Sequence, residues 1–503
     1  MPSTTDVLIV GSGIGGATLA YGLVQHGVRV TMLERGFSLP RESQNWDVKA
    51  VFHDKRYVPQ EEWMDKDGQR FRPGNYYYVG GSSKLFGGTM MRFRERDFEA
   101  LEHAGGVSPA WPIRYSDLAP YYDRAEQMYQ VHGRNGADPT APDGMAPYPY
   151  PEMDNEPFIQ AVADALKNVG VTAFPMPAAI QNHPGGACIH CKTCDGFPCK
   201  VHAKCDAEVS AIQPALATGL LTLKTGCVVD TLTLSPDGCL VQSARYREGG
   251  VAKEISAPII VLAGSAVNSA AILLRSACPQ APKGIANSSD VVGRHYMAHN
   301  NTALMSMGWK QNPTMFQKTL SINDYYFGDK AYPYPMGNVQ LLGKLQGGML
   351  TAGQKYVPAF VGSLMAQHSV DWWVMSEDLP DPQNRVTVED DQIKVSYTAN
   401  NLEAHQQLVK RAVGMMKDIG FQWNVAKFMG GLSVSHQCGT VRFGNDPRTA
   451  ALDSFCRSYD HRNLFVVDAS FMPSSAAVNP ALTIAAQALR VADHIASSGL
   501  HAA

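Results

Sequence analysis

The apolar positions near the start of the chain form two short runs separated by a helical pattern. Residues 7–10 predict a buried strand, and the Ala- and Leu-rich residues that follow predict a helix. A second apolar run, 28–33, predicts another strand, which ends at Glu34. Strand, helix and strand in this order are typical of a βαβ unit with parallel strands. We therefore expect an α/β fold with a Rossmann-like unit at the N-terminus.

Farther along, the pattern changes from helical spacing to period-two alternation and back again. Helices are predicted at 117–131, 156–169, 207–216, 269–274, 402–419 and from Pro480 onward. Strands are predicted at 221–234, 242–246, 259–262, 325–327, 370–375, 385–389, 393–397 and 464–467. The alternation between about 301 and 429 indicates an antiparallel sheet inserted into the first fold.

Composition excludes several classes of partner. The chain has 503 residues, 45% of them hydrophobic, and a net charge of −3 that offers no basic surface to nucleic acid. It contains no apolar run of about 18 residues, so we expect no membrane span. Because the first strand begins within a few residues of Met1, we expect no secretory signal and a cytoplasmic location.

Glycines between the first strand and helix are spaced Gly11-x-Gly13-x-x-Gly16. Gly11 allows a tight turn, Gly13 lets the backbone approach a pyrophosphate, and Gly16 lets the helix pack closely on the sheet. The helix N-terminus offers N–H groups to the phosphates. Glu34 is placed to accept hydrogen bonds from a ribose and to repel a 2′-phosphate. The spacing therefore predicts FAD or NAD and excludes NADP.

Two C-terminal segments carry candidate chemistry. Residues 433–440 read SVSHQCGT, and residues 479–483 read NPALT at the start of the last predicted helix. Asn479 suits the cap of that helix and Pro480 its first turn, so the positive helix end can face a flavin. His436 and Asn479 form a candidate pair for one alcohol. A neutral imidazole takes the hydroxyl proton, and the carboxamide orients the oxygen.

The chain resembles the glucose–methanol–choline (GMC) oxidoreductases along its whole length. The resemblance rests on the first glycine motif, the loop GGSSKLFGG at 80–88, and the segments SHQCGTVRFG, NLFVVDAS and NPALTIAAQALRVADHI. It implies FAD, a Rossmann-like FAD-binding domain and an α+β substrate domain with an antiparallel sheet. It also implies that His436 is the catalytic base and Asn479 its partner.

The resemblance further implies which residues contact FAD. They lie in the two glycine loops, at the ends of strands and at the start of the last helix: Gly11, Gly13, Ile14, Gly15, Gly16, Glu34, Arg35, Gly81, Ser82, Ser83, Phe86, Gly87, Gly88, Val229, Ala263, Gly264, Asp468, Ala469, Asn479, Pro480, Ala481 and Leu482. Some relatives attach FAD through a His in the second loop. Lys84, Leu85 and Phe86 stand there in this chain, so we expect non-covalent FAD.

The expected domains are discontinuous. The FAD-binding domain is predicted at 1–100, 180–300 and 430–503, and the substrate-binding domain with its covering loops at 101–179 and 301–429. A chain of this length suits two or three lobes. Its oligomeric state is left open.

Substrate class is suggested by likeness within the family. The length, the run Arg92-Phe93-Arg94 and the pattern CxxCxxCDGFPC resemble bacterial pyranose-oxidase-like members, including glycoside 3-oxidases. We therefore expect oxidation of a CH–OH group of a sugar or glycoside, at C3 of a pyranose, with O2 reduced to H2O2. The alternatives are a dehydrogenase with a quinone or protein acceptor, a sterol or other alcohol oxidase, and a non-redox lyase.

Five cysteines lie close together at Cys188, Cys191, Cys194, Cys199 and Cys205. Thiolates at such spacing can hold an iron–sulfur cluster or zinc, and they can also remain structural thiols. The match to a ferredoxin run is imperfect, because Pro198 precedes the fourth cysteine instead of following it. A reducing cytoplasm disfavours disulfides. No metal site is assigned.

Overall fold

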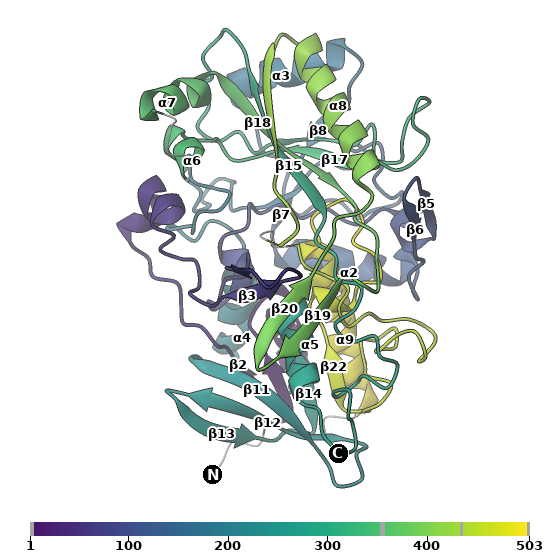
Figure 1. Cartoon of the computed structure of the whole chain (residues 1–503). Helices are drawn as coiled ribbons and strands as arrows, with labels where there is room; N and C mark the ends of the chain where they lie inside the picture. Colours follow the sequence, from purple (N-terminus) through teal and green to yellow (C-terminus); the bar gives the residue numbers. More distant parts are fainter. Residues whose placement is uncertain (1–4, 353–357, 433–435, 500–503) are drawn as a thin grey trace.

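The computed structural model describes residues 5–352, 358–432 and 436–499. Figure 1 shows a parallel sheet in the lower half of the molecule and a large antiparallel sheet in the upper half. The α-helices within the described residues are α1 (Ile14–Gln25), α2 (Tyr115–Met128), α3 (Pro157–Asn168), α4 (Gln213–Ala217), α5 (Ala266–Arg275), α6 (Gly347–Thr351), α7 (Ala359–His368), α8 (Leu402–Asp418) and α9 (Ala481–Ser498). None of these described helices is long and apolar enough to cross a bilayer.

The parallel sheet combines strands from three distant parts of the chain. Its order is β10 (Leu221–Lys224), β2 (Val30–Leu33), β1 (Val7–Val10), β14 (Ile259–Leu262) and β22 (Leu464–Val466). The four strands β2, β1, β14 and β22 are wholly buried, as expected for parallel strands covered on both faces. Helix α1 connects β1 to β2 and contacts α9. The predicted Rossmann-like α/β unit is confirmed.

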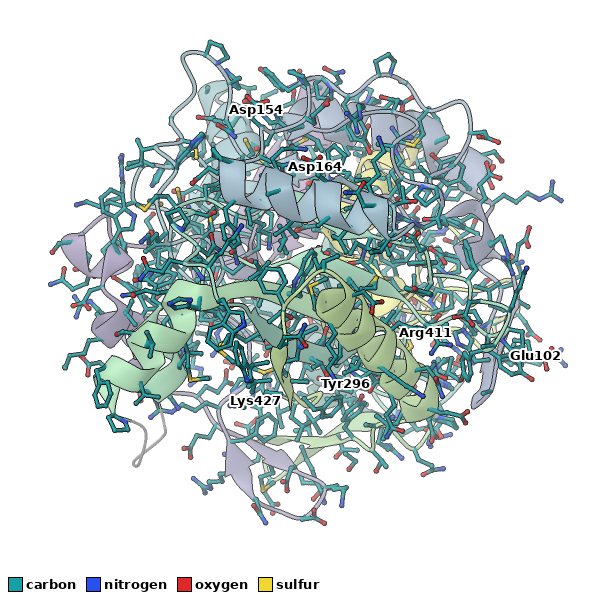
Figure 2. All side chains as sticks on the ribbon, turned by 90° about the horizontal axis from the view of Figure 1, so that it is seen from above. Glu102, Asp154, Asp164, Tyr296, Arg411 and Lys427 are labelled. Atoms are coloured by element: carbon teal, nitrogen blue, oxygen red, sulfur yellow. The ribbon has the colours of Figure 1, made fainter. Side chains whose placement is uncertain are left out.

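The antiparallel sheet has six strands. Their order is β21 (Trp423–Phe428), β15 (Asn300–Met307), β18 (Ser369–Ser376), β17 (Asn338–Leu341), β16 (Leu320–Ile322) and β8 (Ala173–Pro175). Figure 2, seen from above, shows α3 with Asp164 and α8 with Arg411 lying across this sheet. The predicted antiparallel sheet is thus present.

The pleat of this sheet separates a core face from an open face. Leu304, Trp372 and Leu341 lie opposite one another on β15, β18 and β17, and they share a hydrophobic core with α8. The adjacent row, Ala303, Trp373 and Gln340, points to the other face because side chains alternate along a strand. This second row forms one wall of the cavity described below.

Four smaller sheets complete the described fold. One contains β11 (Cys227–Leu234), β12 (Val241–Glu248) and β13 (Val251–Ile255). Another contains β19 (Arg385–Glu389), β20 (Gln392–Ser396), β3 (Trp63–Asp65) and β4 (Arg70–Phe71). The two-stranded pairs are β5 (Leu101–His103) with β6 (Gly106–Ser108), and β7 (Val131–His132) with β9 (Ala178–Ala179).

Three predicted elements differ from the structure. The strand predicted at 221–234 is divided at Gly226, whose φ of +67° turns the chain from β10 in the parallel sheet to β11 in another sheet. The strand predicted at 325–327 is wrong, because those residues form turns and the Tyr326 hydroxyl is buried against Asp97. The helix predicted at 207–216 begins as a π-helix, Glu208–Ile212, before it continues as α4.

His405 connects α8 to two strands of the six-stranded sheet. Its Nε2 lies 2.7 Å from the Thr302 hydroxyl on β15, and its Nδ1 lies 2.9 Å from the Ser376 hydroxyl on β18. Burial lowers the pKa of His405 from 6.5 to about 4. The unfolded chain therefore binds a proton at His405 below about pH 6.5, whereas the folded protein does not until about pH 4.

We predict that the free energy of unfolding falls on acidification from pH 6.5 to pH 4, with His405 contributing about 3 kcal/mol at the lower end. Denaturant unfolding of wild type and His405→Gln across this range checks the prediction. The variant should show a smaller slope with pH, since Gln does not titrate. Parallel slopes for the two proteins would contradict it.

Candidate active site

One cavity of about 770 Å³ lies between the parallel sheet and the open face of the antiparallel sheet. The carboxyl ends of the parallel strands contribute Val10, Leu33 and the residues after β14 and β22. The opposite wall contains Ala303, Gln340 and Trp373. Open α/β sheets bind ligands at the carboxyl ends of their strands, so the cavity lies where a dinucleotide is expected.

The first glycine motif forms a cradle at one end of this cavity. A Cβ on Gly11 would overlap the carbonyl oxygen of Ala263, and a Cβ on Gly16 would overlap that of Gly11. These two glycines are therefore required by packing within the protein. A Cβ on Gly13, in contrast, would meet no protein atom within 4 Å. Gly13 borders the cavity, so the space beside it is available to a phosphate group of a bound dinucleotide.

Glu34, at the end of β2, is buried beside the cradle. Its carboxylate accepts hydrogen bonds from the Ser12 backbone N–H at 3.1 Å, the Ser12 hydroxyl at 2.6 Å and the Gly36 backbone N–H at 2.7 Å. Burial raises the pKa of Glu34, and these three donors oppose that rise. Glu34 thus fixes the turn after β1 besides lining the cavity, a structural role that the sequence analysis missed.

Most residues of the predicted cofactor set line the cavity: Gly11, Gly13, Ile14, Gly15, Glu34, Arg35, Gly81, Ser82, Ser83, Phe86, Gly87, Val229, Ala263, Gly264, Asp468, Ala469, Asn479, Pro480 and Ala481. The structure does not bring Gly16, Gly88 or Leu482 to its surface. Gly16 packs against Gly11, Gly88 packs against Ile180, and Leu482 is buried in the core.

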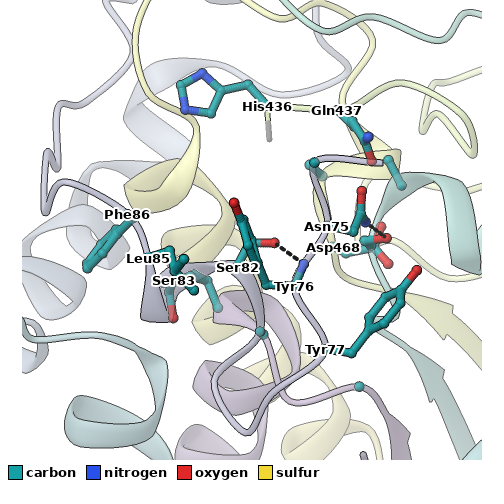
Figure 3. A pocket seen from close by; sticks show the side chains of 18 of the residues that line it. Asn75, Tyr76, Tyr77, Ser82, Ser83, Leu85, Phe86, His436, Gln437 and Asp468 are labelled. Atoms are coloured by element: carbon teal, nitrogen blue, oxygen red, sulfur yellow. Dashed lines mark hydrogen bonds between the residues drawn. The ribbon is translucent and has the colours of Figure 1, made fainter. Parts of the chain in front are cut away.

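The second glycine loop, residues 80–88, lies across the cavity from His436. Figure 3 shows His436 and Gln437 separated by open space from Ser82 and Ser83 of this loop. The Ser83 hydroxyl donates to the Gly80 carbonyl, and Lys84 is buried in ion pairs with Asp206 and Glu208. Lys84 therefore stabilises the loop by linking it to the segment that carries Asp206 and Glu208.

His436 lines the cavity and contacts a second histidine. Its Nδ1 lies 3.1 Å from Nδ1 of His299, whose Nε2 lies 2.9 Å from the carbonyl oxygen of Ser475. A carbonyl only accepts, so Nε2 of His299 donates and, in the neutral ring, its Nδ1 accepts. Nδ1 of His436 must then donate, which leaves Nε2 of His436 unprotonated. Burial lowers the pKa of His436 to about 3, and the charge of Lys318 adds to this shift.

Asn479 lies in the same cavity. Its Oδ1 accepts a hydrogen bond from Nε2 of Gln340 at 3.0 Å, and this contact turns the Nδ2 donors of Asn479 away from Gln340. The predicted capping role is wrong. Helix α9 begins at Ala481 with Pro480, which has no polar side chain, as its N-cap, and the Asn479 oxygen accepts from Gln340 instead.

The sequence analysis missed several residues of the cavity. Asn75 comes from an aperiodic stretch, and Lys318, Gln340 and Trp373 come from the substrate-side sheet and the segment before it. The buried side-chain oxygens of Asn75, Asn301 and Gln340 have no hydrogen-bond partner among the described residues. Buried polar atoms are normally paired. These atoms therefore fit a polar ligand, and with the glycine cradle the cavity fits FAD together with a polar substrate.

The five clustered cysteines are free thiols in the structure. Cys194 and Cys205 are buried, and Cys188, Cys191 and Cys199 are half-buried. Burial raises the pKa of Cys194 and of Cys205 to about 12. In the part of the chain that the structure describes, no three His, Cys, Asp or Glu side chains are grouped as metal ligands would be.

Comparison with protein families identifies the family of the chain. Residues 5–301 and residues 380–488 match two family models, each described as GMC oxidoreductase. The chain belongs to the GMC oxidoreductase family. Membership also identifies it as an oxidoreductase of CH–OH groups, in agreement with the prediction, and it implies FAD as cofactor.

Relatives along nearly the whole chain include sugar-type oxidoreductases. The chain is 29% identical to 6'''-hydroxyparomomycin C oxidase of Streptomyces lividus and to paromamine 6'-oxidase of Streptomyces fradiae, over 98% of its own length and 91% of theirs. It is 26% identical to the fructose dehydrogenase large subunit of Gluconobacter japonicus, over 98% of each chain.

Solved structures share the fold. Pyridoxine 4-oxidase of Mesorbium loti superposes with a TM-score of 0.68 at 20% identity, covering 98% of this chain and 99% of that one. A formate oxidase variant of Aspergillus oryzae gives a TM-score of 0.68 at 15% identity, covering 99% of both chains. The α/β architecture with its antiparallel sheet is therefore that of GMC oxidoreductases.

A matched pair of alanine variants tests the glycine cradle. Gly13 has φ −66° and ψ −175°, which any residue adopts, so Gly13→Ala should leave the melting temperature of FAD-stripped protein within a few degrees of wild type. Its methyl group enters the space beside the cradle, so FAD affinity should fall about tenfold or more.

Gly16→Ala should instead lower the melting temperature of the stripped protein, because its methyl group overlaps the Gly11 backbone. Calorimetry and FAD titration measure both properties. Wild-type FAD affinity in Gly13→Ala would show that no ligand occupies the space beside Gly13.

Proposed function

We propose that the protein oxidises a CH–OH group of a sugar or glycoside, with His436 as the base and Asn479 as its partner. The observation that carries the proposal is the hydrogen-bonded chain from the Ser475 carbonyl through His299 to His436, which leaves Nε2 of His436 as a proton acceptor. Bound FAD supplies the hydride acceptor for such a reaction.

The chain's own residues prepare the alcohol for oxidation. Nε2 of His436 accepts the hydroxyl proton, and the Nδ2 donors of Asn479 hold the alcohol oxygen. The lowered pKa keeps the imidazole of His436 neutral at ordinary pH, so it is ready to accept a proton without first losing one. The Ser475 carbonyl holds this arrangement in place through His299 before the substrate arrives.

The proposed substrate is a pyranose oxidised at C3, and the proposed acceptor is O2, which yields H2O2. Relatives named as oxidases of hydroxyparomomycin and paromamine and as a fructose dehydrogenase support a polyhydroxylated substrate. The dehydrogenase among them keeps a quinone or protein acceptor as the second candidate. Release of H2O2 under air distinguishes the two acceptors.

The proposed FAD-binding domain comprises 1–100, 180–300 and 430–503, and the proposed substrate domain comprises 101–179 and 301–429. The strands of the parallel sheet all come from the first set of ranges. The cytoplasmic location stays a prediction.

Replacement of His436 tests the proposed base. His436→Ala should retain FAD but reduce it with substrate about 10²-fold to 10⁴-fold more slowly, because the variant lacks the proposed acceptor of the hydroxyl proton. The measurement is anaerobic bleaching of the flavin by stopped flow, over a panel of monosaccharides, O- and C-glycosides and sterols. Bleaching at the wild-type rate would contradict the role of His436. A flavin that no panel compound bleaches would exclude the proposed oxidation.

The mode of FAD attachment has its own test. Lys84 is held by Asp206 and Glu208, and Leu85 and Phe86 offer no nucleophile, so we propose that FAD is bound non-covalently. Acid precipitation should therefore release all of the flavin into the supernatant, where absorbance measures it. Yellow colour that stays in the protein pellet would contradict this prediction.

A further inference from the structure

An ion pair between the buried Lys318 and the half-buried Asp195 lines the cavity and has no part in the chemistry proposed so far. Lys318 precedes β16, whereas Asp195 lies between Cys194 and Cys199 of the cysteine-rich segment. The Lys318 side chain is 4% exposed and that of Asp195 is 23% exposed. Removing two charges from water is costly, so a pair in this position needs either structural partners or a ligand.

Asp195 is held in place from three sides. Its second carboxylate oxygen accepts the backbone N–H of Gly343, next to β17. The buried ammonium of Lys204 donates to the carbonyl oxygens of Cys194 and Phe197, which flank Asp195 in the sequence. The N–H of Gly196 donates to the carbonyl of Leu85 in the second glycine loop. The loop that carries Asp195 is therefore anchored on both walls of the cavity.

The pair lies directly against the glycine loop near His436. A Cβ on Gly87 would overlap both the Asp195 carboxylate and the Lys318 ammonium. Lys318 and His436 both line this cavity. The charge of Lys318 also contributes to the lowered pKa of His436. A molecule that presents a hydroxyl to His436 therefore has other atoms within reach of the pair.

Lys318 has donors that the protein does not use. An ammonium carries three N–H donors, and within the described residues Lys318 donates to Asp195 alone. Lys344 is the instructive comparison, because it is equally buried beside Asp371 but also donates to the carbonyls of Ala366 and Ser369 and to the Ser369 hydroxyl. Lys344 does not line the cavity. The Lys344 ammonium uses all of its donors within the protein, whereas the Lys318 ammonium does not.

The chemistry of the pair points to neutral hydroxyl groups. Asp195 balances the charge of Lys318, so the site has little attraction for an anion. A hydroxyl both accepts from an ammonium and donates to a carboxylate, and adjacent hydroxyls on a ring can do both at once. Trp373, half-buried on the same wall, offers a flat apolar surface to the ring that bears them.

We propose that Lys318 and Asp195 form a subsite for a hydroxyl of the sugar other than the one oxidised, and that this contact selects which ring carbon faces His436. The inference rests on the proposed function and adds the residues that determine specificity. A substrate that lacks this hydroxyl leaves the remaining donors of Lys318 without a partner, so discrimination against that substrate should be strong.

The test combines variants of the pair with deoxy sugars. The preferred sugar and its monodeoxy derivatives are titrated calorimetrically into FAD-loaded His436→Ala protein, in which binding is measured without turnover. We expect one deoxy derivative to bind about tenfold to hundredfold more weakly than the parent. Added Lys318→Met or Asp195→Asn should remove that difference, while the other derivatives keep theirs.

Lys344→Met is the matched control. It should lower the melting temperature, because it leaves the buried Asp371 without its ion-pair partner, but it should not change the ratio of affinities for parent and deoxy sugar. If Lys318→Met loses FAD or fails to fold, Asp195→Asn decides the question, since asparagine keeps the size of the side chain and removes only the charge and one of the two acceptor oxygens.

The outcomes separate the two proposals. Equal weakening of the parent and every deoxy sugar by the pair variants would assign Lys318 and Asp195 a structural role and overturn the subsite. Sugars that still reduce the flavin through His436 would leave the proposed function standing in that case. Absence of sugar binding and of flavin reduction in the wild-type protein would exclude both.

Discussion

The close approach of the first turn of α1 to the ends of β14 and β22 is the constraint on which the site depends. Gly11 lies against the carbonyl of Ala263, and Gly15 lies against the carbonyl of Val467, with no room for a side chain at either position. This contact brings the positive end of α1 to the same cavity as Asp468 and the start of α9. A side chain at either glycine would push the start of α1 away from the ends of β14 and β22 and so widen the cradle.

Around this cradle, residues far apart in the chain determine the protonation of one imidazole. His299 follows the last turn before β15, and its φ of +63° directs the ring toward both His436 and Ser475. Asp378 accepts the backbone N–H groups of Ala298 and His299 and so fixes that turn. The tautomer of His436 is therefore determined by the tertiary structure, through a residue that lies 137 positions away in the chain.

The sequence predicted the features that contiguous residues encode. The βαβ unit, the glycine cradle and the helices α3, α8 and α9 follow from apolar periodicity and glycine spacing, which act locally. The strand predicted at 325–327 is wrong because the aromatic side chain of Tyr326, which suggested a strand, is buried in a turn where its hydroxyl donates to Asp97. Lys318 and Asp195 are 123 residues apart, so no local pattern relates them. Asn479 lines the cavity, but its hydrogen bond with Gln340 was visible only in the fold.

The alternation along β15, β18 and β17 has a consequence for how this protein can diverge. Each residue on the cavity wall, such as Trp373, is followed or preceded by one that packs under α8, such as Trp372. Substitutions on the wall can therefore accumulate without disturbing the packed layer beneath it. A duplicated copy of the gene could acquire a preference for a different alcohol while its thermal tolerance stays nearly the same.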